Sequence, residues 1–243
     1  AMESAKSNGK KLHVMGLVSD GGVHSHNTHL YALVKMAKQM GLDNVYIHCF
    51  MDGRDVPPES GKGYIEELQQ QLDRMEFGRI ATISGRFYAM DRDNIWDRVE
   101  KAYAALADGE GVIETDPVQA MQNSYDKGVT DEFVIPTVIT EGGKPVATVD
   151  EGDSIIFFNF RPDRARQITR SFIYPDFDKF ARKKGFLNPC YVSFTQYDVT
   201  FNDRLDVAFK PETYTNTLGE YLSKKGIRQF RIAETQKYAH VTF

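Results

Sequence analysis

Cysteine is scarce in this sequence, and its two cysteines lie far apart. Cys49 and Cys190 each fall inside an apolar, strand-like segment, where buried reduced thiols are more common than a bridge. A disulfide framework is therefore excluded as the source of stability, and a reducing, cytoplasmic location is expected.

Long apolar runs are also missing. The longest, around residues 154–158, is far shorter than the ~20 residues that a membrane-spanning helix needs. Residues 1–11 contain no apolar stretch of the kind that a secretory signal requires. The sequence therefore predicts neither membrane insertion nor export.

The chain has no surplus of positive charge. Its 30 Lys and Arg residues face 34 Asp and Glu residues, for a net charge of -4, which is the wrong sign for a protein that binds nucleic acid or anionic membranes with its whole surface. Any anion site must be local. With 41% hydrophobic residues over 243 positions, the composition is that of one large or two small globular domains.

The first hundred residues repeat a strand followed by a helix. Apolar segments predict strands at residues 12–18, 45–51 and 79–84. Helical spacing follows each of them, at residues 28–40, from near residue 60, and around Trp96 and Leu106. Three βα units in succession predict an α/β fold, a three-layer α/β/α sandwich with a mainly parallel sheet.

The rhythm changes after residue 115. Asp116 and Pro117 predict a helix start, and segments 134–140 and 146–149 predict a hairpin, an antiparallel addition at the sheet edge. Alternation then resumes. The remaining predicted elements are a strand at 154–159, a helix through Ile168 and Phe172, a strand at 191–194, a helix at 217–225 and a strand at 228–233.

The loops that follow the predicted strands share a charged character. In an open α/β sheet, ligands bind beyond the carboxyl ends of the strands. Guanidinium groups present a planar fork of donors that suits phosphate and carboxylate. One phosphate rarely needs five arginines, so the predicted ligand carries both a phosphate and a carboxylate. The residues at these strand ends are His24, Arg54, Asp55, Arg86, Arg92, Arg161 and Arg164.

Each of these residues also has a structural explanation when taken alone. Loop arginines are usually solvated or form surface ion pairs of little energetic value, and Asp55 beside Arg54 could simply be an ion pair. Recurrence at successive strand ends favours the functional interpretation. On that interpretation Asp55, kept ionised by its neighbour, accepts and returns a proton on a substrate hydroxyl.

Other catalytic patterns are absent. His24, His26 and His29 lack the spacing of a zinc motif, and no cysteine or carboxylate cluster stands beside them. Gly21 and Gly22 could hold a phosphate through backbone N–H groups, although no dinucleotide-binding, Walker or nucleophile-elbow pattern occurs. The chain offers groups that grip an anion and no convincing nucleophile or metal site.

Five motifs together resemble those of the cofactor-independent phosphoglycerate mutases. They follow the family's order and spacing over practically the whole chain. That family belongs to the alkaline phosphatase superfamily and interconverts 3-phosphoglycerate and 2-phosphoglycerate in glycolysis. The motifs are Ser19-Asp20-Gly21-Gly22-Val23-His24-Ser25-His26, Asp52-Gly53-Arg54-Asp55, Gly85-Arg86-Phe87-Tyr88-Ala89-Met90-Asp91-Arg92-Asp93, Asn159-Phe160-Arg161-Pro162-Asp163-Arg164 and the stretch from Glu234 to Phe243.

The resemblance implies one part of a two-domain enzyme. In this family a phosphatase domain holds two manganese ions and a serine that is transiently phosphorylated, and a phosphotransferase domain is inserted into it. Residues 1–243 resemble the inserted domain alone, with the return crossing starting at about 234–243 and the phosphatase domain absent. Manganese is therefore expected in the full-length enzyme, bound by the missing domain, and no metal is expected in this chain.

The resemblance also implies roles for individual residues. His24, Arg54, Asp55, Arg86, Arg92, Arg161 and Arg164 would bind the phosphoglycerate. Asp55 would serve as general acid and base toward the glycerate hydroxyls, and Lys237 would help to hold the phosphoryl group beside the missing serine. Gln236 stands where many relatives have Glu, and we assign no consequence to it.

Two alternatives remain open on the sequence alone. The chain could be a stand-alone binding or sensor module for phosphorylated carboxylic acids, which would use the same arginines without a metal. It could also be a metal-dependent phosphatase of the same superfamily. For the mutase, the expected partners are the two phosphoglycerates and the phosphatase domain of the same chain; the protein is expected to be a monomer that binds neither nucleic acid nor membrane.

Overall fold

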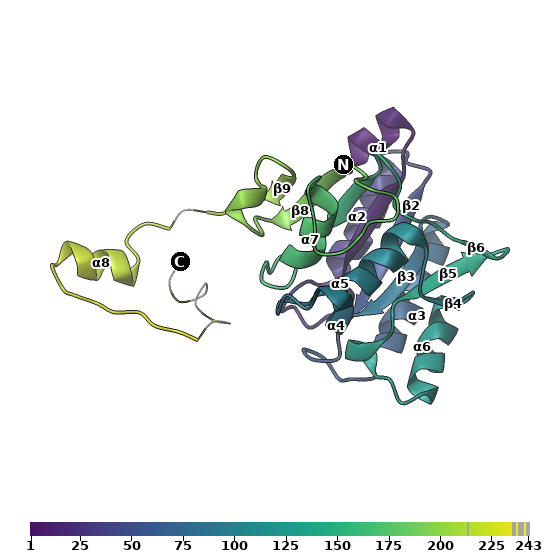
Figure 1. Cartoon of the computed structure of the whole chain (residues 1–243), viewed down its shortest axis with the longest axis horizontal. Coiled ribbons are helices and arrows are strands. Elements are labelled where there is room, and N and C mark those ends of the chain that lie inside the picture. The colour runs from purple at the N-terminus through teal and green to yellow at the C-terminus, as the bar shows by residue number, and fades with distance from the viewer. Residues whose placement is uncertain (213, 235–236, 238–240, 242–243) are drawn as a thin grey trace. The chain divides into compact units, whose positions relative to one another are not determined.

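The chain divides into two compact units, Ala1–Lys210 and Pro211–Phe243. The computed structural model describes residues 1–212, 214–234, 237 and 241. The first unit contains the sheet, and the second contains helix α8 (Leu218–Lys224) (Figure 1). The candidate residues of the strand-end loops all belong to the first unit.

A nine-stranded sheet forms the centre of the first unit. The strand order is β4-β5-β3-β2-β1-β7-β8-β9, and β6 pairs with β5. Six strands run parallel, whereas β5 is antiparallel to both β3 and β6. The strands are β1 (Leu12–Leu17), β2 (Val45–Met51), β3 (Arg79–Gly85), β4 (Val112–Glu114), β5 (Thr137–Glu141), β6 (Lys144–Pro145), β7 (Ser154–Phe157), β8 (Cys190–Thr195) and β9 (Asp206–Phe209).

Helices cover both faces of the sheet, and each face has its own apolar core (Figure 1). One core is built on α1 (Met2–Asn8), α2 (Asn27–Gln39), α3 (Gly61–Met75) and α6 (Pro117–Asp126). The other is built on α4 (Arg86–Ala89), α5 (Trp96–Tyr103), the π-helical turn η1 (Ala104–Asp108) and α7 (Arg166–Ile173). Two short turns, η2 (Asp131–Phe133) and η3 (Val199–Phe201), complete the unit.

The helices follow their sequence signals closely. Helix α2 buries Leu30, Val34 and Ala37 at helical spacing, which places one apolar stripe against the sheet. The Asp116 side chain accepts a hydrogen bond from a backbone N–H in the first turn of α6, and Pro117 occupies the position where no N–H is needed. The predicted three-layer α/β/α architecture is confirmed.

Three details of the expected topology are wrong. The hairpin exists, but its second strand is Lys144–Pro145 and not 146–149: Val146 N–H still donates to Ile139 O in β5 (2.8 Å), whereas Val149 N–H donates to Leu106 O (2.9 Å), outside the sheet. The hairpin strand β5 is also not the edge, since β4 lies outside it. Residues 228–233 form no strand, and no described strand pairs with them.

None of the described helices combines the length and the apolar composition of a membrane span. Both cysteines are free thiols; Cys49 is buried in β2 and Cys190 is partly exposed at the start of β8.

Candidate functional site

Four neighbouring strands bring the candidate residues together. In the sheet, β3, β2, β1 and β7 lie side by side and parallel, so their carboxyl ends meet at one edge. Hydrogen bonds join the loops at that edge: Ser19 Oγ donates to Asp52 Oδ2 (2.8 Å), and the backbone N–H of Phe160 donates to His24 O (2.8 Å). Topology thus places loops far apart in sequence against one another.

Arg86 is the buried centre of this edge. Its Nη1 donates to Asp52 Oδ1 at 2.6 Å and to Asp55 Oδ2 at 2.7 Å, and its Nη2 lies 2.9 Å from His24 Nε2. The residue is only 2% exposed. One guanidinium group therefore connects the loops that follow β1, β2 and β3.

Close backbone packing sets the position of Arg86. A Cβ atom on Gly85, the residue before it, would lie 2.3 Å from Glu132 O, so no larger residue fits between β3 and η2. The backbone N–H of Gly85 donates to Val134 O (2.8 Å). The turn η2 therefore fixes where α4 starts and where its first side chain points.

Asp52 is a buried carboxylate held in its charged form. Burial acts to raise its pKa, but hydrogen bonds from the Asp55 N–H and the Ser19 hydroxyl, together with the charge of Arg86, outweigh burial and lower the pKa of Asp52 below its usual value. Asp52 Oδ1 also accepts from the backbone N–H of Arg54 (3.2 Å). The Asp52 charge balances that of Arg86, and its hydrogen bonds to the backbone N–H groups of Arg54 and Asp55 hold the turn that carries Asp55.

His24 is neutral, and its tautomer follows from its contacts. Burial first, and then the charge of Arg86, lower its pKa to about 4. A guanidinium group can only donate, so His24 Nε2 is the acceptor and the ring proton sits on Nδ1. Nδ1 is buried without a hydrogen-bond partner and lies 3.7 Å from Asp163 Oδ1.

Two of the other arginines, Arg92 and Arg161, contact Asp163. Arg92 Nη1 donates to Asp163 Oδ2 at 3.1 Å, and Arg161 Nε donates to Oδ1 at 3.0 Å. Arg164 Nη1 donates to Met90 O (3.2 Å). Burial first, and then the charges of Arg92, Arg86 and Arg54, lower the pKa of Arg164 to about 10.

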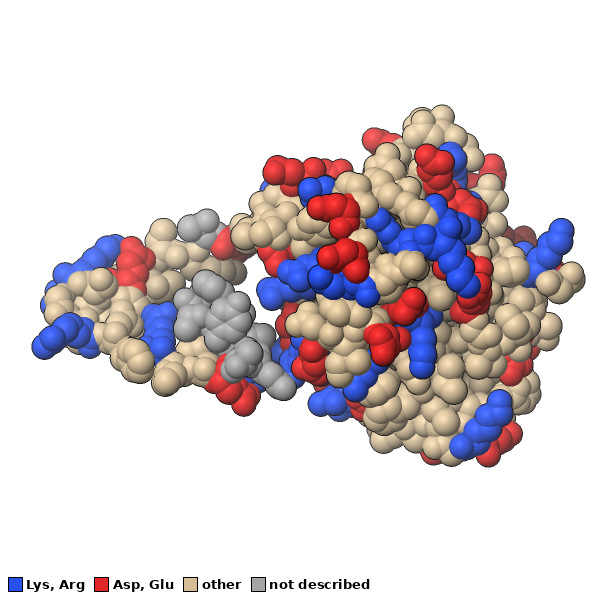
Figure 2. All heavy atoms as spheres, viewed as in Figure 1, with Lys and Arg blue, Asp and Glu red and all other residues tan. Residues whose placement is uncertain are grey.

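The cluster is far less positive than its arginines alone suggest. We call it the arginine site and define it by five arginines, four carboxylates and His24. Because His24 is neutral, one net positive charge remains. On the face shown in Figure 2, Lys and Arg side chains likewise lie among Asp and Glu side chains. The members are Arg54, Arg86, Arg92, Arg161, Arg164, Asp52, Asp55, Glu132, Asp163 and His24.

The predicted residues fall into a buried and an accessible group. His24 and Arg86 are buried, whereas Arg54, Asp55, Arg92, Arg161 and Arg164 are at least partly exposed. The expected Arg54–Asp55 pair does not form: Arg54 Nη1 contacts Glu132 Oε1 (3.1 Å), and Asp55 contacts Arg86 instead. The outer group is the part that a ligand can reach.

Lys237 does not belong to the same compact unit as the arginine site. It lies in Pro211–Phe243 and is exposed. Of the predicted motif at 234–243, residues 235–236, 238–240 and 242–243 lie outside the described residues. The role of Lys237 stays a prediction.

No metal centre can be assembled from the described part of the chain. Within it, no three or more His, Cys, Asp and Glu side chains are grouped as metal ligands. His26 instead accepts a hydrogen bond from the Thr28 N–H at the start of α2 (3.3 Å), and the ring of His29 packs against Phe160 and Phe194. These histidines have structural contacts.

Residues 1–199 match the family model described as the BPG-independent PGAM N-terminus. The chain belongs to this phosphoglycerate mutase family. It is 58% identical over all 243 residues to the 2,3-bisphosphoglycerate-independent phosphoglycerate mutases of Lachnoclostridium phytofermentans and Acetivibrio thermocellus, and covers 47% of each. The chain thus spans about half the length of these relatives.

A solved structure shows the same fold. The phosphoglycerate mutase of Leishmania mexicana, crystallised at low cobalt concentration, superposes with a TM-score of 0.89 at 32% identity. The match covers 99% of this chain and 45% of that one. Membership of the family and the mixed α/β fold therefore rest on both sequence and structure.

Sequence reasoning missed three carboxylates of the site. Asp52 and Asp163 stand inside motifs that were recognised for their arginines, and their proximity to those arginines was an available signal. Glu132 had none, because it meets Arg54 only through the fold. Omitting them made the predicted site too positive.

Proposed function

We propose that the chain is the phosphotransferase part of a 2,3-bisphosphoglycerate-independent phosphoglycerate mutase that interconverts 3-phosphoglycerate and 2-phosphoglycerate. The names of its relatives and the partial coverage of their length support this assignment. The single observation that carries it is the arginine site, which gathers five guanidinium groups at one sheet edge in an otherwise acidic protein. Such a site suits a small ligand with both a phosphate and a carboxylate.

We assign the role of each residue from its burial: accessible side chains contact the substrate, and buried ones position them. The accessible arginines Arg54, Arg92, Arg161 and Arg164 bind the anionic groups of the phosphoglycerate. Arg86 and His24 lie behind them and fix the Asp55 carboxylate, which is 2.7 Å from Arg86 Nη1. Asp55, whose side chain is 22% exposed, gives a proton to the glycerate oxygen that loses the phosphoryl group and takes a proton from the hydroxyl that receives it.

The chain retains the glycerate while the phosphoryl group resides elsewhere. In the proposed reaction, a serine outside this chain accepts the phosphoryl group and returns it to the other hydroxyl. The arginine site keeps the carboxylate and lets the glycerate reorient between the two transfers. Lys237 helps to hold the phosphoryl group.

A metal cofactor is proposed for the full-length protein. It consists of two manganese ions, which would activate the serine and stabilise charge on the phosphoryl group. The described residues of this chain do not fit such a pair, because they contain no group of three metal-ligating side chains. We therefore propose that the metal pair is bound by the remainder of the protein, outside the arginine site.

The unit Pro211–Phe243 is proposed to be the return crossing into the phosphatase domain. Large apolar side chains of this unit are exposed to solvent: Leu218 is 75% exposed, Phe230 86% and Ile232 76%. Such side chains are usually covered in a complete protein. The crossing would then start near residue 211, earlier than the 234–243 segment expected from sequence.

The remaining assignments are proposals of the same kind. The chemistry requires no nucleic acid and no membrane, and the net charge of -4 disfavours both. We assign the full-length protein to the cytoplasm as a monomer, with the phosphatase domain of the same chain as its partner.

An enolase-coupled assay on the full-length protein with manganese tests this function. Conversion of 3-phosphoglycerate is expected, whereas residues 1–243 alone should melt cooperatively and show no turnover, because they contain no phosphoryl-accepting serine. A full-length protein that binds phosphoglycerate without turnover would favour a sensor module. Turnover by residues 1–243 would show that the chemistry resides in this chain.

A further inference from the structure

Asp163 occupies an unusual position for a carboxylate in an anion site. It contacts two of the arginines that are proposed to bind the substrate, Arg92 and Arg161, and it faces His24 Nδ1 at 3.7 Å. Its charge repels the ligand that those arginines attract. A residue with this cost to anion binding needs a compensating role.

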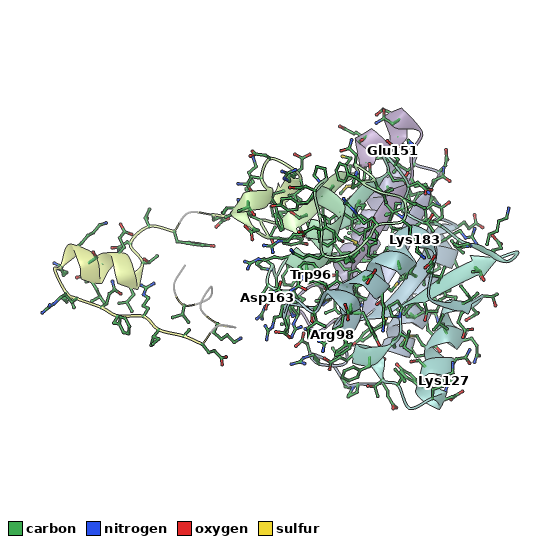
Figure 3. The ribbon with its side chains drawn as sticks, viewed as in Figure 1. Trp96, Arg98, Lys127, Glu151, Asp163 and Lys183 are labelled. Atoms are coloured by element: carbon green, nitrogen blue, oxygen red, sulfur yellow. The ribbon has the colours of Figure 1, made fainter. Side chains whose placement is uncertain are left out.

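The depth of the three side chains suggests that role. The Asp163 side chain is 11% exposed, against 19% for Arg92 and 30% for Arg161. The two arginine side chains are therefore more accessible to an incoming anion than the carboxylate is. Figure 3 labels Asp163 at the same margin of the unit as Trp96, where α5 begins.

The contact geometry fixes both arginines at once. Arg161 approaches Asp163 through Nε (3.0 Å) and Nη2 (3.3 Å), so its plane is set by two bonds to one carboxylate. Arg92 comes from the loop after α4 and shares Oδ2. Burial acts to raise the pKa of Asp163, but the hydrogen bond and charge of Arg161 outweigh it and lower the pKa, so the carboxylate stays charged.

We propose that Asp163 sets the selectivity of the arginine site: its carboxylate orients Arg92 and Arg161 as one pair, and its charge rejects small anions that cannot engage both. A ligand with two anionic groups at a fixed spacing gains from the orientation. Inorganic phosphate gains little from the orientation of the two arginines and is repelled by the charge of Asp163. Asp163 is thus a positioning residue and acts through the arginines.

This inference rests on the proposed function, because it takes phosphoglycerate as the selected ligand. The test uses the full-length protein and two probes, inorganic phosphate and 3-phosphoglycerate. Calorimetry measures phosphate binding, which requires no mutase activity. The enolase-coupled assay measures the KM for 3-phosphoglycerate and the Ki for phosphate.

Asp163→Asn keeps the shape and removes the charge. Phosphate should bind on the order of three- to tenfold more tightly, as expected for one charge several ångströms away. The selectivity for 3-phosphoglycerate over phosphate should fall by on the order of tenfold. The matched control is Asp198→Asn, which removes a carboxylate paired with Arg170 (3.4 Å) outside the arginine site and should change neither quantity.

Asp163→Glu separates charge from orientation. It should leave phosphate affinity within about twofold, because the charge is retained, and should raise the KM for 3-phosphoglycerate, because the arginines are displaced. This variant also serves if Asp163→Asn does not fold.

Phosphate affinity that is unchanged or weaker in a folded Asp163→Asn protein would overturn the proposal, as would an unchanged KM in Asp163→Glu. A wild-type protein without mutase turnover would instead count against the proposed function, and the calorimetric comparison would still decide the role of Asp163.

Discussion

Two buried polar networks cross the same strands of the sheet. One is the arginine site at the carboxyl ends. The other lies within the strands and joins Thr82, His48, His13 and Asp153. Both contain histidines with lowered pKa values, yet only the first reaches solvent.

The inner network is fully satisfied. Thr82 Oγ1 lies 2.9 Å from His48 Nδ1, His48 Nε2 lies 2.8 Å from His13 Nδ1, and His13 Nε2 lies 3.2 Å from Asp153 Oδ2. With Asp153 charged and both rings neutral, each group donates to the next one toward Asp153: the Thr82 hydroxyl to His48, His48 to His13, and His13 to the carboxylate. Burial is the main cause that lowers both histidine pKa values.

The arginine site differs because it keeps unused donors. Among the described residues of the site, His24 Nδ1 and Arg86 Nε are buried without a hydrogen-bond partner. A network whose donors are all used specifies the packing of a core, whereas spare donors beside an opening leave capacity for a ligand. Burial and a perturbed pKa alone would not have separated the two regions.

Replacing Asp55 should have the largest effect on activity. In the full-length protein, Asp55→Asn should lower kcat by ~10²–10⁴-fold, the usual contribution of general acid and base catalysis, with a much smaller change in substrate binding. Steady-state kinetics measure both. Asp97→Asn, which changes an exposed carboxylate on α5, is the control; weakened binding with kcat preserved would make Asp55 a structural partner of Arg86.

Replacing His48 should lower stability and leave activity unchanged, the reverse of what is expected for Asp55. His48→Phe leaves His13 Nδ1 and the Thr82 hydroxyl without partners, so the free energy of unfolding should fall by on the order of 1–3 kcal/mol, while kcat per folded molecule is unchanged. Chemical denaturation and the mutase assay give the two values. Thr82→Val removes only the outermost group of this hydrogen-bonded series, so its free energy of unfolding should fall by less. A large loss of kcat in folded His48→Phe would show that the inner network also serves catalysis, and would contradict the distinction between the two networks.

The smallest predicted effect is a pH dependence of the loss of stability caused by His48→Phe. Folded His48 has a lowered pKa, so below the unfolded value of 6.5 the unfolded state takes up a proton that the folded state does not. Stability from neutral His48 is therefore complete above pH 6.5 and declines as the pH falls. His48→Phe removes this linkage, so its destabilisation should be smaller at pH 5 than at pH 7.5. Equal destabilisation at both pH values would contradict the lowered pKa, because it would mean that His48 takes up a proton as readily in the folded as in the unfolded state.

Measuring the difference between variant and wild type avoids an opposing contribution. Burial raises the pKa of Asp131 to about 6, so folded Asp131 holds a proton between about pH 4 and 6 and adds stability as the pH falls through that range. Because Asp131 is present in both proteins, its contribution cancels in the comparison.

Much of the fold was predictable because strong periodic signals repeat. The predicted strand at residues 45–51 coincides with β2, and the capping signal at Asp116 is used as expected. Elements without such signals were missed: β4 has three residues and α4 has four, too few for any period to show. Their formation depends on contacts made by the rest of the fold.

The site was predictable at the level of loops and not of pairs. Parallel βα units place successive loops at one edge, which suffices to gather Arg86 and Arg161. Sequence adjacency did not predict the partner of Asp55, which is Arg86 and not Arg54. Partner choice and burial depend on distances between loops, which only the folded chain supplies.

A crystal structure of the full-length protein with 3-phosphoglycerate tests the central claim most directly. We predict ligand oxygens within hydrogen-bond distance of Arg54, Arg92, Arg161 and Arg164, with His48 and Asp153 untouched. A ligand bound elsewhere, with no ligand oxygen near these arginines, would contradict the assignment of the substrate site to this edge of the sheet.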